Sequence, residues 1–162
     1  MPPSITARYM GALGGLLQIE QGASASLPQW LADRRGWEEL AVEVERVLDT
    51  LSDADRDEIL ILTTNYGRAG ALEYYVDEHR LAPVICSHNT YSLWSEGRTD
   101  APLYLVLGYR RETLEKLFGS VEQVGTKSCT LCMDYEDDVP IWLVAEPIVP
   151  LSSVWDQLRG YG

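Results

Sequence analysis

The sequence predicts an α/β domain, a three-layer Rossmann-like sandwich built around a mostly parallel sheet. Short apolar runs alternate along the chain with stretches whose apolar residues recur every three or four positions. The short runs are typical of strands buried on both faces, and the longer period is typical of amphipathic helices. A chain of 162 residues is long enough for one such domain with its own core.

The first half of the chain begins with a segment that we interpret as a lead-in or linker, residues 1–26, ahead of a single domain over residues 27–162. The lead-in carries two prolines, four glycines and the tail GASAS. A short helical piece is expected at 28–35. The clearest amphipathic helix follows at 37–51, with apolar residues on one face and acids on the other. The acidic stretch 52–57 is expected to be a solvated turn.

The second half alternates strands with helices in the same way. Strands are expected at 59–62, 83–87, 103–109, 121–130 and 141–145, and helices at 71–80, 112–121 and 151–158. Only the short stretch CMDYEDDVP joins the last two strands. An antiparallel pairing of these two strands is therefore open, because a parallel pair needs a longer crossover.

The stretch ILILTTNYGRAGALEYY, residues 59–75, passes from a strand through glycines into a helix. Such a turn places backbone N–H groups at the carboxyl edge of a sheet, where an anion or a polar ligand can bind. The spacing is neither G-x-G-x-x-G nor G-x-x-x-x-G-K-[ST]. Either the glycines only let the helix pack close to the strand, or the loop faces a ligand. In the second case the candidate binding residues are Asn65, Tyr66, Gly67, Arg68 and Gly70.

A polar segment follows the next strand and contains His88, Asn89 and Tyr91. If the two strands are parallel neighbours, these residues lie beside the glycine loop. A histidine at a strand end can act as a base, orient a ligand or form a structural hydrogen bond. The spacing shows no acidic partner for it, and the chain has no G-x-S-x-G nucleophile motif. We therefore assign no catalytic residue and keep His88, Asn89 and Tyr91 as binding candidates.

Charge and composition exclude several classes of function. The net charge of −12 argues against a nucleic-acid partner and against docking on anionic lipid, because both need clustered Lys and Arg. No apolar run approaches the ~20 residues that cross a membrane, and the start MPPSITARYM does not resemble a signal peptide. Nine Tyr and five Trp against one Phe suit half-exposed surfaces, including sugar-binding ones.

Cys129 and Cys132 form a C-x-x-C pair with three possible roles. They could form a local disulfide, remain free buried thiols, or bind zinc together with Cys86 and His88. We commit to the disulfide candidate and to no metal site or cofactor. The acidic run 134–138 lacks the spacing of a calcium loop and is expected to be a solvated turn.

Several motifs in order resemble the C-terminal soluble domain of glycosyltransferase family 39 proteins. They are LPQWLADRRGWEEL, NYGRAGALEYY, PVICSHNTYSLWSEG and CTLCMDYEDDVPIWLV, and the likeness covers about residues 27–155. The family consists of bacterial and archaeal membrane enzymes related to dolichyl-phosphate-mannose protein mannosyltransferases and to the lipid A aminoarabinose transferase. Arg68 stands where the family pattern has Glu, and an arginine would strengthen a phosphate site.

The resemblance implies a larger parent protein with many membrane helices and a polyprenyl- or dolichyl-phosphate-linked sugar donor. It places this domain on the extracytoplasmic face, where a Cys129–Cys132 disulfide is favoured. The family's catalytic carboxylates lie in the membrane part, so none is carried over to this chain. The partner that it implies is the parent's own membrane-embedded catalytic region.

We therefore expect a recognition domain in which residues 65–70 and 88–91 form one polar cleft. The cleft would bind an acceptor, a glycan or a lipid-phosphate head group. One alternative is a structural lid that packs on the membrane region and binds nothing. Another is a free-standing Rossmann-like enzyme, against which the missing nucleotide and nucleophile motifs speak.

Overall fold

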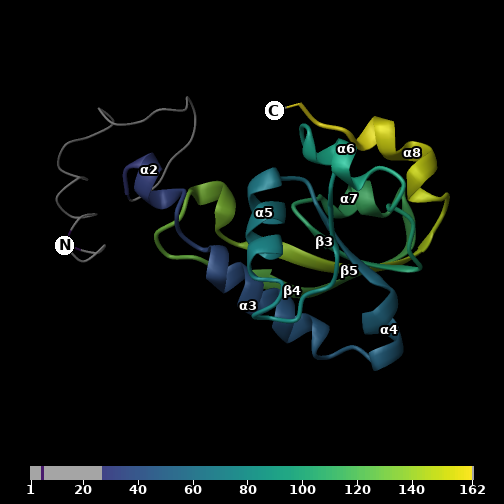
Figure 1. The fold of residues 1–162 in the computed structure, drawn as a ribbon, viewed down its shortest axis with the longest axis horizontal. Helices are drawn as coiled ribbons and strands as arrows, with labels where there is room; N and C mark the ends of the chain where they lie inside the picture. The colour runs from purple at the N-terminus through teal and green to yellow at the C-terminus, as the bar shows by residue number, and fades with distance from the viewer. Residues whose placement is uncertain (1–4, 6–26, 162) are drawn as a thin grey trace.

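A five-stranded mixed sheet organises the chain in the computed structural model (Figure 1), which describes residue 5 and residues 27–161. The strands are β1 (Ile59–Thr63), β2 (Val84–Cys86), β3 (Leu103–Leu107), β4 (Phe118–Lys127) and β5 (Val139–Pro147). Their order across the sheet is β2-β1-β3-β5-β4. Apart from Ile5, the expected lead-in at 1–26 lies outside the described residues.

The sheet is parallel at one end and antiparallel at the other. β1 pairs in parallel with β2 and with β3, so that Leu62 lies opposite Ile85 on one side and Val106 on the other. β5 runs antiparallel to β3 and to β4. The antiparallel option for the last two strands is therefore confirmed, while the sheet is less parallel than we predicted. The connection from β4 to β5 is too short for a parallel crossover.

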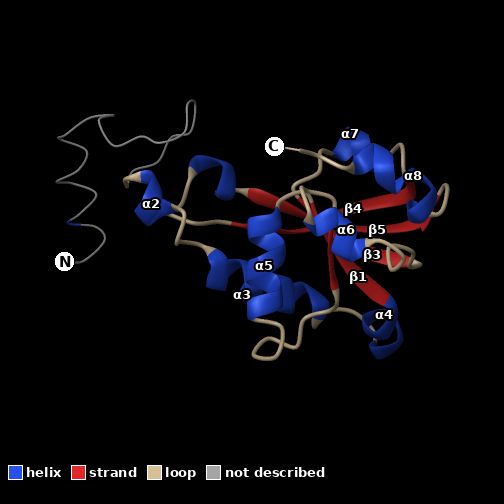
Figure 2. Ribbon diagram, turned by 45° about the horizontal axis from the view of Figure 1, so that its top comes forward, coloured by secondary structure: helices blue, strands red, loops and turns tan. Residues whose placement is uncertain are grey.

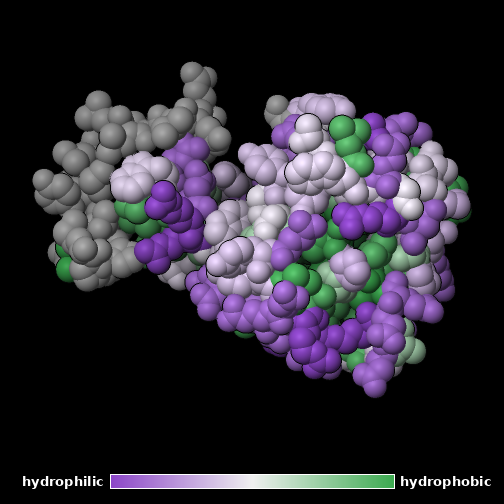
Figure 3. All heavy atoms as spheres, viewed as in Figure 1, coloured by the Kyte–Doolittle hydropathy of each residue, from purple (hydrophilic) through white to green (hydrophobic). Residues whose placement is uncertain are grey.

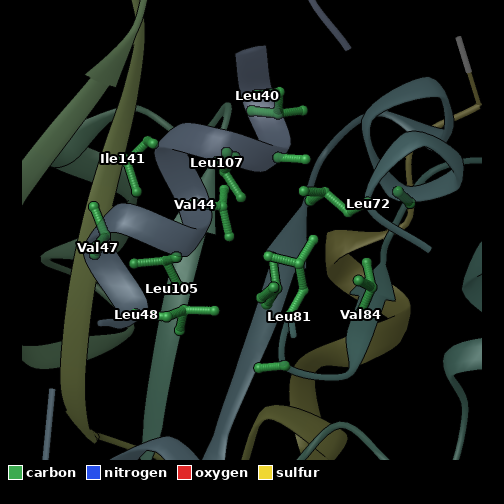
Figure 4. Close-up of a cluster of buried hydrophobic side chains, with 14 of the residues drawn as sticks. Leu40, Val44, Val47, Leu48, Leu72, Leu81, Val84, Leu105, Leu107 and Ile141 are labelled. Atoms are coloured by element: carbon green, nitrogen blue, oxygen red, sulfur yellow. The ribbon is translucent and has the colours of Figure 1, made fainter. Parts of the chain in front are cut away.

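Two helices cover one face of the sheet, α3 (Trp37–Leu48) and α5 (Tyr66–Tyr74). Figure 4 shows Val44 of α3 directed toward the strand residues Leu105 and Leu107, with Leu72 of α5 beside them. All four side chains are fully buried. Burying a leucine or valine contributes about 1.5–3 kcal/mol, so this cluster fixes α5, and with it the glycine loop, against β1.

The opposite face carries a second apolar cluster and two more helices, α7 (Arg111–Leu114) and α8 (Leu151–Leu158), which lie near one another in Figure 2. Trp155 of α8 and Leu114 of α7 are buried in this cluster. The indole Nε1 of Trp155 donates a hydrogen bond of 3.1 Å to the carbonyl oxygen of Ser92. Ser92 belongs to α6 (Tyr91–Ser95), so α8 holds the segment that follows β2. The bounds of α8 match the prediction.

Two predicted elements were wrong. The helix expected at 112–121 ends at Leu114, and β4 begins at Phe118. Phe118 is buried in the second cluster and contacts Tyr104 with ring centroids 5.3 Å apart, so tertiary packing selects a strand there. The expected acidic turn is the helix α4 (Asp53–Glu58). Ser52 caps it, because its hydroxyl oxygen accepts a hydrogen bond of 3.2 Å from the Asp55 N–H.

The remaining elements are short. α2 (Gln29–Ala32) lies inside the helical piece expected at 28–35, α3 ends before residue 51, and η2 (Asp134–Glu136) is a single 3-10 turn. α5 begins at Tyr66 and ends at Tyr74, before the expected end near residue 80. Residues 66–70, which we expected to be a loop, are therefore the first turn of this helix, because Asn65 caps it. Among the described residues, no helix combines the length and apolar character needed to cross a membrane.

Candidate binding site at the carboxyl edge of the parallel strands

Asn65 sets the geometry of the glycine loop by capping α5. Its side-chain oxygen accepts hydrogen bonds from the backbone N–H groups of Gly67 at 2.6 Å and Arg68 at 3.3 Å. A cap of this kind contributes about 1 kcal/mol to helix stability. The polar end of Asn65 is thus occupied by the helix itself. Only two residues, Thr64 and Asn65, separate the end of β1 from the start of α5.

The two glycines in the first turns of α5 have different surroundings. A Cβ on Gly67 would lie 2.9 Å from the Asn65 side-chain oxygen and 3.3 Å from the Trp37 ring. Gly67 therefore allows close packing between α5 and α3, which supports the structural interpretation of this position. Gly70 is exposed, and a Cβ there would meet no heavy atom within 4 Å. Packing within the described residues does not explain why Gly70 is a glycine.

Arg68 is buried and joins two sequence motifs that lie far apart in the chain. Its Nε donates to a carboxylate oxygen of Glu136 at 3.0 Å, and its Nη2 donates to the Tyr135 carbonyl oxygen at 3.0 Å. The Arg68 side chain is 8% exposed and that of Glu136 is 3% exposed. Glu136 is therefore an exception to the solvated turn that we expected over residues 134–138.

The predicted cleft corresponds to a shallow, mostly aromatic hollow of about 360 Å³. We call it the aromatic hollow, and its lining residues are Tyr66, Asn89, Thr90, Tyr91 and Trp94. Tyr66 and Trp94 are 55% and 66% exposed, whereas Tyr91 is buried. The Tyr91 and Trp94 rings lie 5.1 Å apart, centroid to centroid. Exposed rings beside an amide and a hydroxyl suit a ligand with both apolar and hydroxyl-bearing faces.

His88 lies behind the aromatic hollow, with its ring centroid 5.2 Å from that of Tyr66. Its Nδ1 is buried and has no hydrogen-bond partner within the described part of the chain. Three predicted residues thus line the hollow: Tyr66, Asn89 and Tyr91. His88 contacts the first of them. The parallel pairing of β1 and β2 brings the two segments together, as the sequence predicted.

The end of the chain holds the segment after β2 in place. The Asn89 N–H donates to the Gly160 carbonyl oxygen at 2.8 Å, and the Gly160 N–H donates to the Ser87 carbonyl oxygen at 3.1 Å. These bonds form a parallel bridge between His88 and Gly160. Asn89 adopts a φ of 51°, a left-handed conformation that asparagine tolerates well. The bridge therefore fixes the backbone on one side of the aromatic hollow.

The hydroxyl group of Tyr91 is buried, although the residue lines the aromatic hollow. Burial raises its pKa, and the neighbouring Glu73 carboxylate raises it further. The phenol therefore stays protonated throughout the physiological range. Figure 3 shows hydrophilic residues around a group of hydrophobic residues in the middle of the face that it draws.

The three cysteines are free thiols in the structure. The Cys132 thiol donates to the Cys129 carbonyl oxygen at 3.1 Å, and burial together with the Cys129 side chain raises the pKa of Cys132 to about 12. Burial also raises the pKa of Cys86. The Cys129–Cys132 disulfide stays a prediction. The described residues contain no group of three His, Cys, Asp or Glu side chains able to hold a metal ion, so the zinc alternative has no site there.

Sequence reasoning missed two parts of this edge of the sheet. Trp94 was visible as an aromatic residue in the segment HNTYSLW, and its spacing of three residues from Tyr91 places both on one side of a helix. The hydrogen bonds of Gly160 with Ser87 and Asn89 could not be predicted from local sequence, because they depend on where the last residues of the chain lie in the fold.

Comparison of this chain with models of protein families, with curated proteins and with solved structures finds no match. The resemblance to glycosyltransferase family 39 therefore rests on the quoted motifs alone. The structure adds that these motifs lie together in space. NYGRAG contacts the segment that contains Glu136 through Arg68, and it contacts SHNTY through Tyr66.

Proposed function

We propose that this chain is a carbohydrate-recognition domain, and that the aromatic hollow is its binding site. The observation that carries the proposal is the pair of exposed rings, Tyr66 and Trp94, around a hollow that also contains Asn89 and Thr90. Aromatic rings can stack on the apolar face of a sugar, while an amide and a hydroxyl can bond its hydroxyl groups. The three-layer Rossmann-like arrangement is part of the same proposal.

The motif resemblance supports a wider proposal for the parent protein. In it, the chain is the extracytoplasmic domain of a membrane glycosyltransferase that uses a polyprenyl- or dolichyl-phosphate-linked sugar donor. The domain would assist recognition of the acceptor, the glycan or the lipid-phosphate head group beside the membrane-embedded catalytic region. The reacting carboxylates would belong to that region and not to this chain.

A second candidate is a structural lid that packs on the membrane region. The observation that favours it is the exposure of apolar residues on α6, where Leu93 is 52% and Trp94 66% exposed. Exposed apolar residues gathered at one place often mark a protein contact. The two candidates differ in whether the isolated chain binds sugar.

An NMR titration of the chain with monosaccharides and sugar phosphates tests the proposal. Chemical shifts should change at Asn89 and Thr90, and Tyr66→Ala or Trp94→Ala should abolish the change. The matched control is Tyr74→Ala, because Tyr74 is an 81% exposed tyrosine of the same helix outside the aromatic hollow. Asn65 is unsuitable for this purpose, since it caps α5.

A null result across the panel with the fold intact would reject sugar recognition and favour the lid. Shifts that persist unchanged in both Tyr66→Ala and Trp94→Ala would place the ligand elsewhere. The two outcomes are separable, because the variants are first checked for native spectra and unchanged thermal midpoints.

A further inference from the structure

A second groove lies at the same edge of the sheet, beyond the ends of β1 and β3. It has a volume of about 450 Å³, and its lining includes Arg68, Gly108, Arg110 and Arg111. β1 and β3 are adjacent parallel strands. The chain leaves β1 toward the face that carries α5 and leaves β3 toward the face that carries α7. In open α/β sheets such a divergence opens a crevice where ligands bind. We call it the β1–β3 groove.

The floor of the β1–β3 groove requires a glycine. Gly108 has a φ of 88°, and a Cβ on it would collide with the Thr64 hydroxyl and with Nη1 of Arg68. The absence of a side chain lets the guanidinium approach the backbone closely. The loop is also fixed, because the indole Nε1 of Trp142 donates to the Tyr109 carbonyl oxygen at 3.2 Å. Contacts within the chain therefore fix the backbone at Gly108 and Tyr109.

Two buried cations lie beneath the β1–β3 groove, close to the carboxylate of Glu136. Arg68 and Lys127 share one carboxylate, that of Glu136, with N–O distances of 3.0 and 3.9 Å. Lys127 also donates to the Glu136 carbonyl oxygen. Lys127 also lies close enough to the Asp137 carboxylate to help lower the pKa of Asp137, so a second acid contributes to the charge balance. Buried charge is costly unless a counter-charge is near, and Glu136 and Asp137 supply that counter-charge. The positive charge available to an anion therefore comes from the wall of the groove.

The wall formed by the start of α7 presents two further cations. Arg110 is exposed and forms no ion pair with any residue that the structure describes. Arg111 pairs with Glu115 at 2.7 Å, and its guanidinium carbon lies 5.9 Å from the centroid of the Trp142 ring. An arginine guanidinium can donate two hydrogen bonds to one phosphate group. Of the two arginines on this wall, Arg110 is the one whose guanidinium is available for such bonds.

The acids that line the β1–β3 groove are mostly held by other donors. Asp137 accepts from the Cys129 N–H at 2.7 Å, and hydrogen bonds from Cys129 and Asp138 lower the pKa of Asp137. Asp138 accepts from the Ser128 hydroxyl at 3.2 Å. These donors are neutral and leave both carboxylates charged, so Asp137 and Asp138 oppose an anion in the groove, as does Glu112, which has no such donor among the described residues.

We propose that the β1–β3 groove binds a phosphate group, through Arg110 and Arg68 above the bare backbone of Gly108. The site is separate from the aromatic hollow and does not depend on sugar binding there. The phosphate could belong to a soluble phosphate ester or to a lipid head group, because both present the same oxygens to the arginines.

The test is an NMR titration of the chain with inorganic phosphate at constant ionic strength, with sodium chloride and sodium acetate as reference salts. Saturable shifts are expected at Gly108 and Arg110 with phosphate only. Arg110→Gln should weaken binding at least about tenfold, since it removes a charge-assisted hydrogen bond. Glu112→Gln should tighten it. The matched control is Arg35→Gln, which removes the same charge at an exposed position outside the groove.

A second arm identifies the source of the phosphate by co-sedimentation with phosphatidylcholine vesicles, with and without phosphatidic acid. Sedimentation that needs phosphatidic acid and is lost in Arg110→Gln supports a lipid source. Phosphate shifts without sedimentation support a soluble ester. The proposal is overturned if neither arm shows binding by folded protein, if Arg110→Gln binds like the native chain, or if acetate matches phosphate.

Discussion

Replacing Glu136 with glutamine should destabilise the protein strongly, because the change leaves two buried cations without their carboxylate. The side chains of Arg68, Lys127 and Glu136 are 8%, 1% and 3% exposed. Glutamine keeps the size of the side chain and one hydrogen bond to Arg68, so the quantity removed is mainly charge. Breaking a buried ion pair from one side costs about 3–5 kcal/mol. In a domain of this length the thermal midpoint should fall by roughly 6–20 °C.

Urea unfolding at pH 7, followed by tryptophan fluorescence, measures this loss of free energy. The matched control is Glu115→Gln, which removes a carboxylate bound to Arg111 at 2.7 Å with both side chains about half exposed. An exposed helical pair contributes about 0.3–0.5 kcal/mol. The two variants break ion pairs of similar geometry and differ in burial, so the difference between them isolates the effect of burial.

The reasoning is refuted if Glu136→Gln is no less stable than Glu115→Gln. A further variant separates charge from packing: Lys127→Met added to Glu136→Gln should recover part of the loss, because it removes the second buried cation. If the double variant is as unstable as the sum of its parts, packing and not charge explains the effect.

Three further predictions concern single residues. Asn65→Ala should lower the free energy of unfolding by about 1 kcal/mol in a urea titration, whereas Asn65→Asp should nearly keep it, because both Asn and Asp cap helices. Burial raises the pKa of Tyr109 to about 12, while an unfolded tyrosine ionises near about 10. The unfolded state therefore loses this proton first, and stability should fall as pH rises from about 10 to 12, with a shallower fall in Tyr109→Phe. Because the pKa of Cys132 is raised to about 12, iodoacetamide at pH 8 should alkylate it far more slowly in native than in urea-unfolded protein, as read by mass spectrometry.

Local patterns account for the elements that the sequence predicted well. The apolar spacing of α8 and the unbroken apolar runs of β1 and β3 could be predicted, because in each case the residues of that element alone indicate its type. The spacing of Leu114, Leu117 and Phe118 fits a helix equally well, and only pairing with β5 makes Phe118 a strand residue. Ser52 and Asp55 did carry a local capping signal for α4, which our interpretation as a turn overlooked.

The candidate site divides in the same way. The contact between Tyr66 and His88 follows from their positions after β1 and β2, because neighbouring parallel strands end at the same edge of the sheet. The pairing of Arg68 with Glu136 joins positions 68 residues apart, and no local pattern encodes it. The role of Asn65 was ambiguous in the sequence, since the same side chain suits a helix cap and a ligand contact.

The bridge between His88 and Gly160 pairs the backbone just beyond the end of β2, which is the strand at one edge of the sheet. Without residues 159–161, the Ser87 carbonyl and the Asn89 N–H would lose their partners at an unpaired strand edge. Such an edge is a template on which another chain can add a strand, so trimming these residues should favour self-association. A reporter group attached after Tyr161 would instead preserve the bridge and lie near the segment that lines the aromatic hollow. Residues 159–161 thus protect backbone groups at this edge from pairing with another chain, and their end is a suitable position for a probe.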